Sequence, residues 1–462
     1  MFDRKTYIDR RRKLKAAVGK GLIFLLGNAE SSMNYKNNLY PFRQDSSFLY
    51  FIGIDQPELM AVIDIDNNKE ILFGDDLTTE QIIWTGYRTP LKVICDRIGI
   101  KHIKRKNEIE ILINDAIRQK RTIHFLPAYR PEHVELLSSL LGVSASALPG
   151  MVSTTLIKAV VAQRSYKSAE EVVEISKAVN TTVNMQLAAI TLGRRGMTEA
   201  QLAGKIQSVA IGAGGNLSFP TILTQNGQIL HNGYSQSKLA KGNLVLCDCG
   251  AETAMHYAGD LTRTFPVNKK FTSIQKTVYD IVLNAHESAV SMLKPGVLFR
   301  DIHLGACEKL VEGLQHIGLM KGNIKEAVAL GAHALFFPCG LGHMMGLDIH
   351  DMENLGEKYV GYNEDIIQST EFGLKSLRLG RPLEEGFVLT VEPGLYFNPD
   401  LIDEWAAGKK FTSFINYNKL QEFKKLSGIR VEEDFSITTK GSKLLGKKLA
   451  TIPAEIEELR LS

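Results

Sequence analysis

The sequence lacks the short signatures of several large enzyme classes. It contains no HExxH motif, no GxSxG motif and no GxxxxGK[ST] phosphate-binding loop. The string GAGGN at 212–216 is too irregular for a dinucleotide-binding fingerprint. These absences argue against HExxH metalloproteases, GxSxG serine hydrolases and P-loop nucleotide enzymes, so any catalytic chemistry comes from another set of residues.

Cysteine is also scarce. The cysteines are odd in number, widely spaced and form no CxxC pair: Cys95, Cys247, Cys249, Cys307 and Cys339. This usage indicates a reducing compartment and argues against a disulfide framework or a structural zinc site. The N-terminal string MFDRKTYIDRRRKLK is charged and has no apolar segment. We therefore expect no export signal and a cytoplasmic location.

No charge sign dominates, and no apolar run is long. The 55 basic and 51 acidic residues give a formal net charge of +4, which predicts no nucleic-acid partner. The longest apolar runs, such as 21–27, have the length of a strand, which predicts no membrane span. With 462 residues, 44% of them hydrophobic, the chain is long enough for two soluble globular domains.

The pattern of apolar residues predicts an α+β protein of two domains. We expect an N-terminal α/β domain over 1–158, opened by a helix and containing strands in four apolar runs, at 21–27, 48–54, 59–66 and 69–75. The second domain, 159–462, begins with a long helix, because Ser168 and Glu171 form a capping box and apolar residues recur at helical spacing up to Leu192.

The rest of the second domain alternates strand pairs with helices and has no βαβ rhythm. This pattern predicts an α+β layer with a curved antiparallel sheet. Strands are expected at 243–250, 256–267, 387–397 and 429–439, and helices at 273–293, 299–317, 322–335 and 453–460.

The segment FFPCGLGHMMGLDIHD at 336–351 leaves three interpretations open. It holds His343 and His350, with Cys339 four residues before the first of them. Its three glycines make a stable helix unfavourable. The segment alone is compatible with a metal site, with a thiol nucleophile and its histidine, or with a turn between two buried strands.

Four carboxylates end or interrupt apolar strands. Asp248 follows LVLC, Asp260 lies twelve residues further on, Glu392 interrupts VLTVEPGLYF, and Glu432 lies in GIRVEEDFSI. A buried carboxylate needs a partner. Each aspartate has the alternative of a nearby arginine such as Arg263 or of capping a turn, and Glu432 has the alternative of an ion pair with Arg430.

Together with His343, these four carboxylates form an oxygen-rich set with one imidazole. Such a set suits a pair of hard or borderline divalent ions, for which manganese(II) is our first choice and cobalt(II) or zinc(II) the alternatives. Ions about 3.5–4 Å apart share a hydroxide and make it a nucleophile at neutral pH.

At these residues the chain resembles the pita-bread metallopeptidases of the proline-peptidase group, aminopeptidase P and prolidase. The strings DCGAETAMHYAGDLTRTFPV, GLGHMMGLDIHD, LTVEPGLYF and GIRVEEDFSIT occur in the family's order, and YPFRQDSSFLYFIGIDQPE at 40–58 resembles the domain that precedes the catalytic one. The resemblance implies a pita-bread catalytic domain with two divalent ions.

The resemblance also implies a role for each residue of the set. Asp248 would chelate one ion, Asp260 and Glu432 would bridge both, and His343 and Glu392 would complete the second site. Glu392 would also serve in proton transfer beside the bridging hydroxide. His231 would stabilise the tetrahedral intermediate, His350 would contact the substrate at the scissile peptide, and Arg430 would orient the site; for His231 an ordinary loop histidine is the alternative.

The implied reaction is hydrolysis of the Xaa-Pro bond at the free N-terminus of peptides with proline at the second position. A strict Xaa-Pro dipeptidase is the alternative, and a pita-bread protein without peptidase activity is a remote one. Arg378 resembles the prolidase arginine that binds a dipeptide's carboxylate, with a solvated basic face as its alternative. Cys339 replaces a histidine that lines the proline pocket in the family, so it belongs to the predicted substrate wall.

Trp84 resembles a prolidase tryptophan that reaches the neighbouring subunit's active site, and a tryptophan of the core is its alternative. The insert 397–427 is likewise similar to prolidase. The family and Trp84 together lead us to expect a homodimer.

Overall fold

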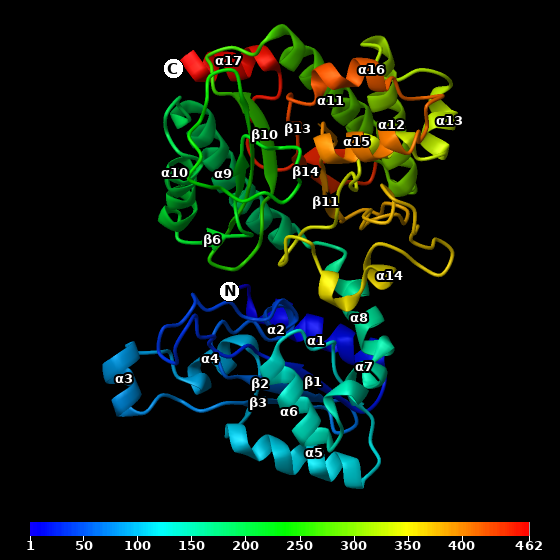
Figure 1. Cartoon of the computed structure of the whole chain (residues 1–462). Helices are drawn as coiled ribbons and strands as arrows, with labels where there is room; N and C mark the ends of the chain where they lie inside the picture. The colour runs from blue at the N-terminus through cyan, green and yellow to red at the C-terminus, as the bar shows by residue number, and fades with distance from the viewer. Residues whose placement is uncertain (462) are drawn as a thin grey trace. The chain divides into compact units, whose positions relative to one another are not determined.

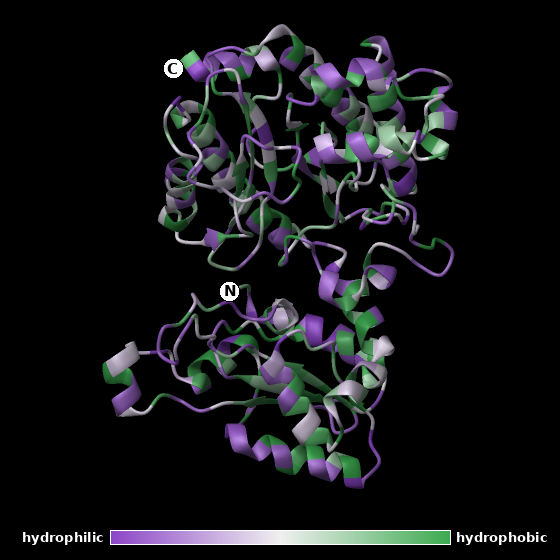
Figure 2. Ribbon diagram, in the orientation of Figure 1, coloured by the Kyte–Doolittle hydropathy of each residue, from purple (hydrophilic) through white to green (hydrophobic). Residues whose placement is uncertain are grey.

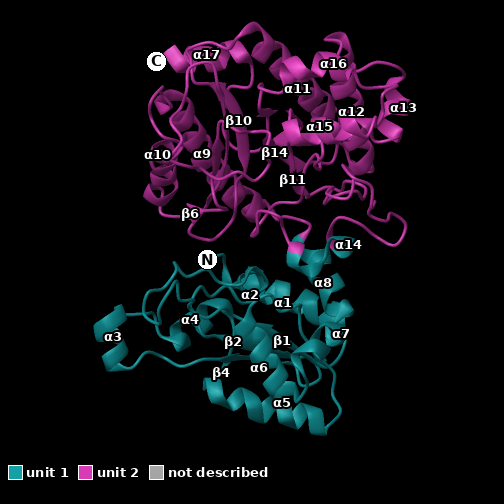
Figure 3. Cartoon of the chain, viewed as in Figure 1, with its two compact units in different colours: residues 1–164, 354–359 teal, residues 165–353, 360–462 magenta. Residues whose placement is uncertain are grey.

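A computed structural model describes residues 1–461, which divide into two compact units (Figure 3). Unit 1 comprises 1–164 together with 354–359, and unit 2 comprises 165–353 and 360 onward. The domain boundary that we expected after residue 158 falls within helix α8 (Thr154–Arg164). Because this helix is continuous, the units divide at its C-terminal end.

Unit 1 is built on a mixed five-stranded sheet in the order β4-β3-β2-β1-β5. Strands β1, β2 and β3 pair antiparallel, whereas β5 and β4 join the two sides in parallel. Its elements are α1 (Arg4–Val18), β1 (Leu22–Leu26), α2 (Ser46–Ile52), β2 (Met60–Asp64), β3 (Lys69–Phe73), α3 (Thr79–Thr85), α4 (Leu91–Ile98), β4 (His102–Lys104), α5 (Ile109–Arg118), β5 (Ile123–His124), α6 (Pro131–Leu141), α7 (Leu148–Met151) and α8.

One face of this sheet packs on α5 and α6. Alternate residues such as Leu22 and Phe24 of β1 join a core with Ile109 and Ile113 of α5 and Leu137 of α6. Figure 2 shows hydrophobic and hydrophilic residues alternating along α5, as an amphipathic helix on a sheet requires. Three of the four expected strands, those of β1, β2 and β3, are thereby confirmed.

The fourth expected strand, 48–54, is wrong, because this run forms helix α2. The Asp45 carboxylate accepts a hydrogen bond from the Phe48 N–H at 2.8 Å and caps the helix. Gly53 ends it in the left-handed conformation with φ of 73°. A cap of this kind contributes about 1 kcal/mol to the stability of the helix. The prediction failed because a short apolar run by itself does not distinguish a buried strand from a buried helix.

Unit 2 places its strands between two groups of helices (Figure 1). Strands β10, β13 and β14 lie between α9 and α10 on one side and α11 and α12 on the other. The elements are α9 (Ala169–Leu192), α10 (Glu199–Gly212), β6 (Asn216–Leu217), β7 (Ile222–Thr224), β8 (Leu244–Cys249), β9 (Ala251–Glu252), β10 (Leu261–Pro266), α11 (Ser273–Ser291), α12 (Phe299–His316), α13 (Ile324–Ala329), β11 (Val388–Val391), β12 (Gly394–Tyr396), α15 (Pro399–Ala407), α16 (Tyr417–Leu420), β13 (Gly428–Arg430), β14 (Glu433–Ile437), β15 (Ser442–Leu444) and α17 (Pro453–Leu461).

The strands of unit 2 pair antiparallel, as expected. Two three-stranded sheets, β10-β8-β7 and β11-β14-β15, accompany the pairs β12-β13 and β6-β9. Helix α9 begins at the predicted capping box: the Ser168 hydroxyl accepts from the Glu171 N–H, and the Glu171 carboxylate accepts from the Ser168 N–H. The result is the α+β architecture with an antiparallel sheet that the sequence predicts.

The helices match expectation except at 322–335. There the chain forms α13 and then the short 3₁₀ helix η3 (Ala332–Leu335), because Gly331 adopts a φ of 84° that interrupts the helix. Helix α14 (Glu357–Val360) lies mostly in the segment 354–359, which belongs to unit 1. Within residues 1–461, no single helix is both long and apolar enough to cross a membrane; only the pair Pro131–Leu141 and Ala145–Met151, bent by 97°, reaches these limits jointly.

Candidate active site

Unit 2 contains a cavity of about 580 Å³ that gathers the predicted site residues. Its walls come from segments far apart in the sequence, from Phe219 before β7 to Glu432 after β13. The predicted residues that line it are His231, Asp248, Asp260, Cys339, His343, His350, Arg378, Glu392, Arg430 and Glu432. Every predicted site residue except Trp84 therefore shares one cavity.

Two adjacent antiparallel strands bring Asp248 and Asp260 together. Asp248 lies in β8 opposite Thr262 of β10, and Asp260 immediately precedes β10. The backbone N–H of Asp260 donates to the carboxylate of Asp434 at 3.0 Å. The Oδ1 atoms of Asp248 and Asp260 are buried and have no hydrogen-bond partner among the described residues. Each of these two aspartates therefore has an oxygen available to a cation.

His343 and Glu392 meet across the loop that follows β11. His343 Nε2 lies 3.6 Å from Glu392 Oε1 and 3.6 Å from Asp260 Oδ2. Thr390 aligns them: its hydroxyl accepts from the His343 N–H at 3.1 Å and donates to Glu392 at 3.4 Å. A Cβ at Gly342 would lie 2.1 Å from the Thr390 carbonyl oxygen, so this close approach requires glycine.

Glu432 lies between β13 and β14 and is fixed by Thr262. The Thr262 hydroxyl donates to Glu432 Oε2 at 2.6 Å, and the same hydroxyl accepts from Arg430 Nε at 3.0 Å. Arg430 forms its ion pair with Asp248, so the expected alternative of an Arg430–Glu432 pair is wrong about the partner. Arg263, the arginine expected as an alternative partner of Asp248 or Asp260, instead forms an ion pair with Glu433 at 2.8 Å.

The electrostatics of this cluster call for a cation. Burial, followed by the neighbouring Asp248 carboxylate, raises the pKa of Asp260 well above its usual range. Burial and the charge of Asp260 do the same to the pKa of Glu432, and burial raises the pKa of Glu392. Donor atoms of Asp260, His343 and Glu432 all lie within 4.8 Å of one another. Buried carboxylates with unpaired oxygens and one imidazole fit hard or borderline divalent ions.

A second group of side chains forms the outer wall of the cavity. His350 lies against His343, with ring centroids 4.4 Å apart, and its Nδ1 is 2.7 Å from Glu353 Oε2. The other oxygen of Glu353 lies 2.8 Å from the guanidinium of Arg378. Arg378 is thus a partly exposed, ion-paired residue of the cavity wall, and its predicted contact with a substrate carboxylate stays a prediction. His231 lines the same cavity from an exposed turn.

Cys339 belongs to the wall and not to a nucleophilic pair. Burial raises the pKa of its thiol to about 12, so it is protonated at neutral pH. A thiol nucleophile requires the thiolate, which leaves the metal-site interpretation of the segment 336–351 favoured. The segment forms turns and bends without a helix, as its glycines predict.

Several residues of the site escaped the sequence analysis. Thr262 and Asp434 lie two residues after Asp260 and Glu432, so strand alternation places each on the face of a predicted ligand and gives a signal that could have found it. Thr390 lies two residues before Glu392 in the same way. Glu353 lies three residues after His350, but its contact with Arg378 joins two loops and gives no signal in the sequence.

Trp84 does not line this cavity and belongs to α3 of unit 1. Its side chain is 81% exposed, beside the exposed Ile83 and Tyr87. The alternative of a core tryptophan is therefore wrong. The expected contact with a neighbouring subunit stays a prediction.

Comparisons with known proteins agree with this geometry. Residues 168–439 match metallopeptidase family M24, and residues 7–124 match the aminopeptidase P N-terminal domain. The chain is 31% identical to the Xaa-Pro aminopeptidase of Escherichia coli (strain K12), covering 100% of this chain and 98% of that protein. It is 30% identical to the Xaa-Pro dipeptidase of Homo sapiens, covering 99% and 92%.

Solved structures show the same likeness over the whole length. A substituted form of Escherichia coli aminopeptidase P in complex with substrate superposes with a TM-score of 0.81 at 29% identity, covering 100% of this chain and 99% of that one. Proline aminopeptidase P II from Yersinia pestis gives a TM-score of 0.80 at 29% identity, covering 100% of both chains. The chain therefore belongs to metallopeptidase family M24, as a metallo-exopeptidase of the Xaa-Pro aminopeptidase and dipeptidase group.

Proposed function

We propose that this chain is an Xaa-Pro aminopeptidase that releases the first residue both from dipeptides and from longer peptides with proline second. The relatives are named for Xaa-Pro hydrolysis, but some are named dipeptidases and others aminopeptidases. The observation that carries our choice is the ion pair between Arg378 and Glu353 in the cavity wall.

The buried cluster is suited to hold the two divalent ions that the family implies. We assign Asp248, Asp260, His343, Glu392 and Glu432 as their ligands and manganese(II) as the native metal, with cobalt(II) or zinc(II) as alternatives. The oxygen-rich donor set supports this assignment. When bound, the ions would supply Lewis acidity at the scissile carbonyl and an activated water at neutral pH.

The surrounding residues act through positions that the cavity gives them. Glu392 lines the cavity beside His343, which suits its carboxylate to carry a proton between the attacking water and the leaving proline nitrogen. His350 and His231 lie where they would contact the peptide at the scissile bond and the developing oxyanion. Arg430 holds the Asp248 carboxylate in place by donating to its Oδ2.

Arg378 is poorly suited to enforce a limit of two residues. A site strongly rejects a substrate that lacks one group only when the rejected complex leaves a buried polar group unpaired. The Arg378 side chain is 29% exposed and already paired with Glu353. A longer peptide, which has no carboxylate at this point, leaves the guanidinium paired and in contact with water, so it incurs little penalty.

The test compares release of the first residue from Xaa-Pro and from Xaa-Pro-Yaa-Zaa. We expect the wild type to hydrolyse both and Arg378→Ala to change the ratio of their kcat/KM values by less than about tenfold, which corresponds to about 1.4 kcal/mol. Glu353→Gln should release Arg378 and shift the ratio toward the dipeptide by up to about fivefold, because an exposed ion pair contributes at most about 1 kcal/mol.

Lys375→Ala is the matched control, because Lys375 is an exposed cation three residues away that does not line the cavity. Its ratio should equal that of the wild type. A wild type that cleaves only dipeptides, with activity on the longer peptide appearing in Arg378→Ala, would overturn the proposal and establish the strict dipeptidase instead.

The remaining expectations are proposals of the same kind. We propose a homodimer in which the exposed apolar group of Ile83, Trp84 and Tyr87 meets the second copy, since three large exposed apolar side chains close together favour a contact surface. Light scattering of the wild type and of Trp84→Ala tests this. We also propose a cytoplasmic location, supported by the free thiols of the five cysteines.

A further inference from the structure

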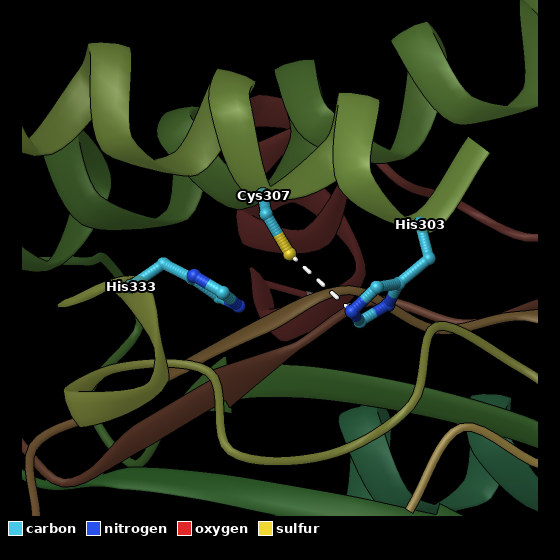
Figure 4. Close-up of side chains that lie close together, drawn as sticks. All are labelled: His303, Cys307 and His333. Atoms are coloured by element: carbon cyan, nitrogen blue, oxygen red, sulfur yellow. Dashed lines mark hydrogen bonds between the residues drawn. The ribbon is translucent and has the colours of Figure 1, made fainter. Parts of the chain in front are cut away.

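A second cluster of metal-binding side chain types lies in unit 2 outside the cavity. His303 and Cys307 project from α12 one turn apart, and His333 projects from η3 toward both of them (Figure 4). The donor atoms of the three residues lie within 4.8 Å of one another. None of the three lines the cavity of the catalytic residues.

All three side chains are buried and poorly satisfied. The exposed fractions are 0% for His303 and Cys307 and 2% for His333. The Nδ1 atom of His303 and both ring nitrogens of His333 lack a partner with hydrogen-bond geometry among the described residues. Buried polar atoms in folded proteins are nearly always paired, so unpaired nitrogens that converge on a thiol need an explanation.

The spacing suits a metal ion. Cys307 Sγ lies 3.5 Å from His303 Nε2. Bond lengths of about 2.3 Å to sulfur and about 2.0–2.1 Å to nitrogen place two ligand atoms roughly 3.5 Å apart across a tetrahedral zinc ion. The first pair already has this separation, and a ring nitrogen of His333 lies within 4.8 Å of donor atoms of both residues.

The protonation states also suit ligation. Burial lowers the pKa of His303 to about 3 and that of His333 to about 4, while the nearby backbone carbonyl of Val328 acts in the opposite direction on the pKa of His333. Both imidazoles are therefore neutral, which is the ligating form. Burial raises the pKa of the Cys307 thiol, so the thiol stays protonated until an ion displaces its proton.

We propose that His303, Cys307 and His333 bind one thiophilic d¹⁰ ion, Zn²⁺ or Cu⁺, at a structural site separate from the catalytic pair. On binding, the S–H bond of Cys307 breaks, the sulfur–metal bond forms, and the proton leaves to solvent. The thiolate and two imidazoles form a soft N₂S set, which selects zinc or copper(I) over manganese.

The site would connect two elements that support the active site. Helix α12 provides two ligands, and η3 provides the third just before the segment 336–351 with Cys339 and His343. Phe337 of that segment already packs on His303, with ring centroids 5.6 Å apart. An ion here would fix the start of the loop that carries the catalytic imidazole.

Cobalt(II) is the probe, because cobalt–thiolate bonds give near-ultraviolet charge-transfer absorption and the catalytic ligands include no thiolate. The full chain, produced in cobalt-supplemented medium, should show this band and contain one ion per chain beyond the catalytic pair, measured by mass spectrometry of the metal. Cys307→Ser should lose the band and that ion. Cys95→Ser is the control, since Cys95 is a buried free thiol of unit 1, and it should keep both.

The spectrum of the cobalt-loaded wild type tests for a cobalt–thiolate bond even if Cys307→Ser fails to fold. No thiolate band in the cobalt-loaded wild type, or a band and metal content unchanged in Cys307→Ser, would overturn the proposal. Asp260→Ala should lose ions of the catalytic pair yet keep the thiolate band, which separates the two sites. Parallel loading of the wild type with zinc or with copper(I), each against a competing chelator, then identifies which of the two ions the site retains.

Discussion

A buried ion pair between Lys167 and Asp351 connects the N-terminal end of α9 to the loop 336–351, which contains His343 and His350. Lys167 Nζ lies 2.7 Å from Asp351 Oδ2, and the two side chains are only 2% and 1% exposed. Asp351 directly follows His350, and Lys167 directly precedes the N-cap of α9. We predict that Lys167→Met, which keeps the aliphatic stem and removes the charge, destabilises unit 2 and misplaces this loop.

The magnitude follows from the distance and the burial. At 2.7 Å and an effective dielectric constant of about 20, Coulomb's law gives about 6 kcal/mol of attraction, from which desolvation of both ions subtracts. Breaking a buried pair by removing one partner typically costs about 3–5 kcal/mol. In Lys167→Met the unpaired Asp351 can take up a proton, which costs about 4 kcal/mol at pH 7 for an ordinary aspartate. This cost is an upper limit on the stability lost through the unpaired charge. We therefore expect about 3–4 kcal/mol.

Urea unfolding followed by tryptophan fluorescence measures this change. Trp405 is buried in unit 2, whereas Trp84 is exposed in unit 1, so a Trp84→Phe background reports unit 2 alone. The control is Lys177→Met, which removes a 63% exposed lysine paired with Glu174 on the same helix and should cost less than about 1 kcal/mol.

Two results would refute the reasoning. The first is a loss in Lys167→Met no larger than that in Lys177→Met. The second is strict additivity in Lys167→Met/Asp351→Asn, because residues in one buried pair must show a coupling energy. If the loop is misplaced as predicted, kcat/KM falls together with stability, since a shift of about 1 Å at a catalytic group can cost about a hundredfold.

Three further predictions concern the cavity. Asp260→Ala should lose bound divalent metal and reduce activity to background, measured by metal analysis and proline release; activity that survives chelation of the wild type contradicts the two-ion site. Glu392→Ala should abolish turnover even in protein that still contains metal, and turnover at the wild-type rate would remove its role in proton transfer. Cys339→His should change KM for Xaa-Pro substrates by several-fold with kcat nearly unchanged, and a fall in kcat of a hundredfold would show that Cys339 takes part in the chemistry.

The sequence predicted best the features that depend on neighbouring residues. The capping box at Ser168 and Glu171 involves residues three positions apart, so its two hydrogen bonds can be predicted from the sequence alone. The error at 48–54 has a local cause as well, since Asp45 and Gly53 are cap residues that the apolar run between them concealed.

The residues of the site likewise fall into those that the sequence predicted and those that depend on tertiary packing. Asp248, Asp260, Glu392 and Glu432 were recognisable because carboxylates in apolar strands are costly and because the motifs resemble a family. The bond from Glu353 to Arg378 joins residues from two loops, and no periodicity relates them. His303 and Cys307 share a helix face at the spacing i, i+4, but His333 joins them only through the packing of η3 on α12.

The order in which the cavity residues occur along the chain has a consequence for biosynthesis. The cavity needs His231 near its beginning and Glu432 near its end, so a ribosome must translate about two hundred residues between the first and the last of them. The segment 354–359 likewise joins unit 1 only after most of the chain has been made. Domains generally fold as units during synthesis. A nascent chain therefore cannot hydrolyse peptides until synthesis is nearly finished, which keeps unfinished copies inert in the cell.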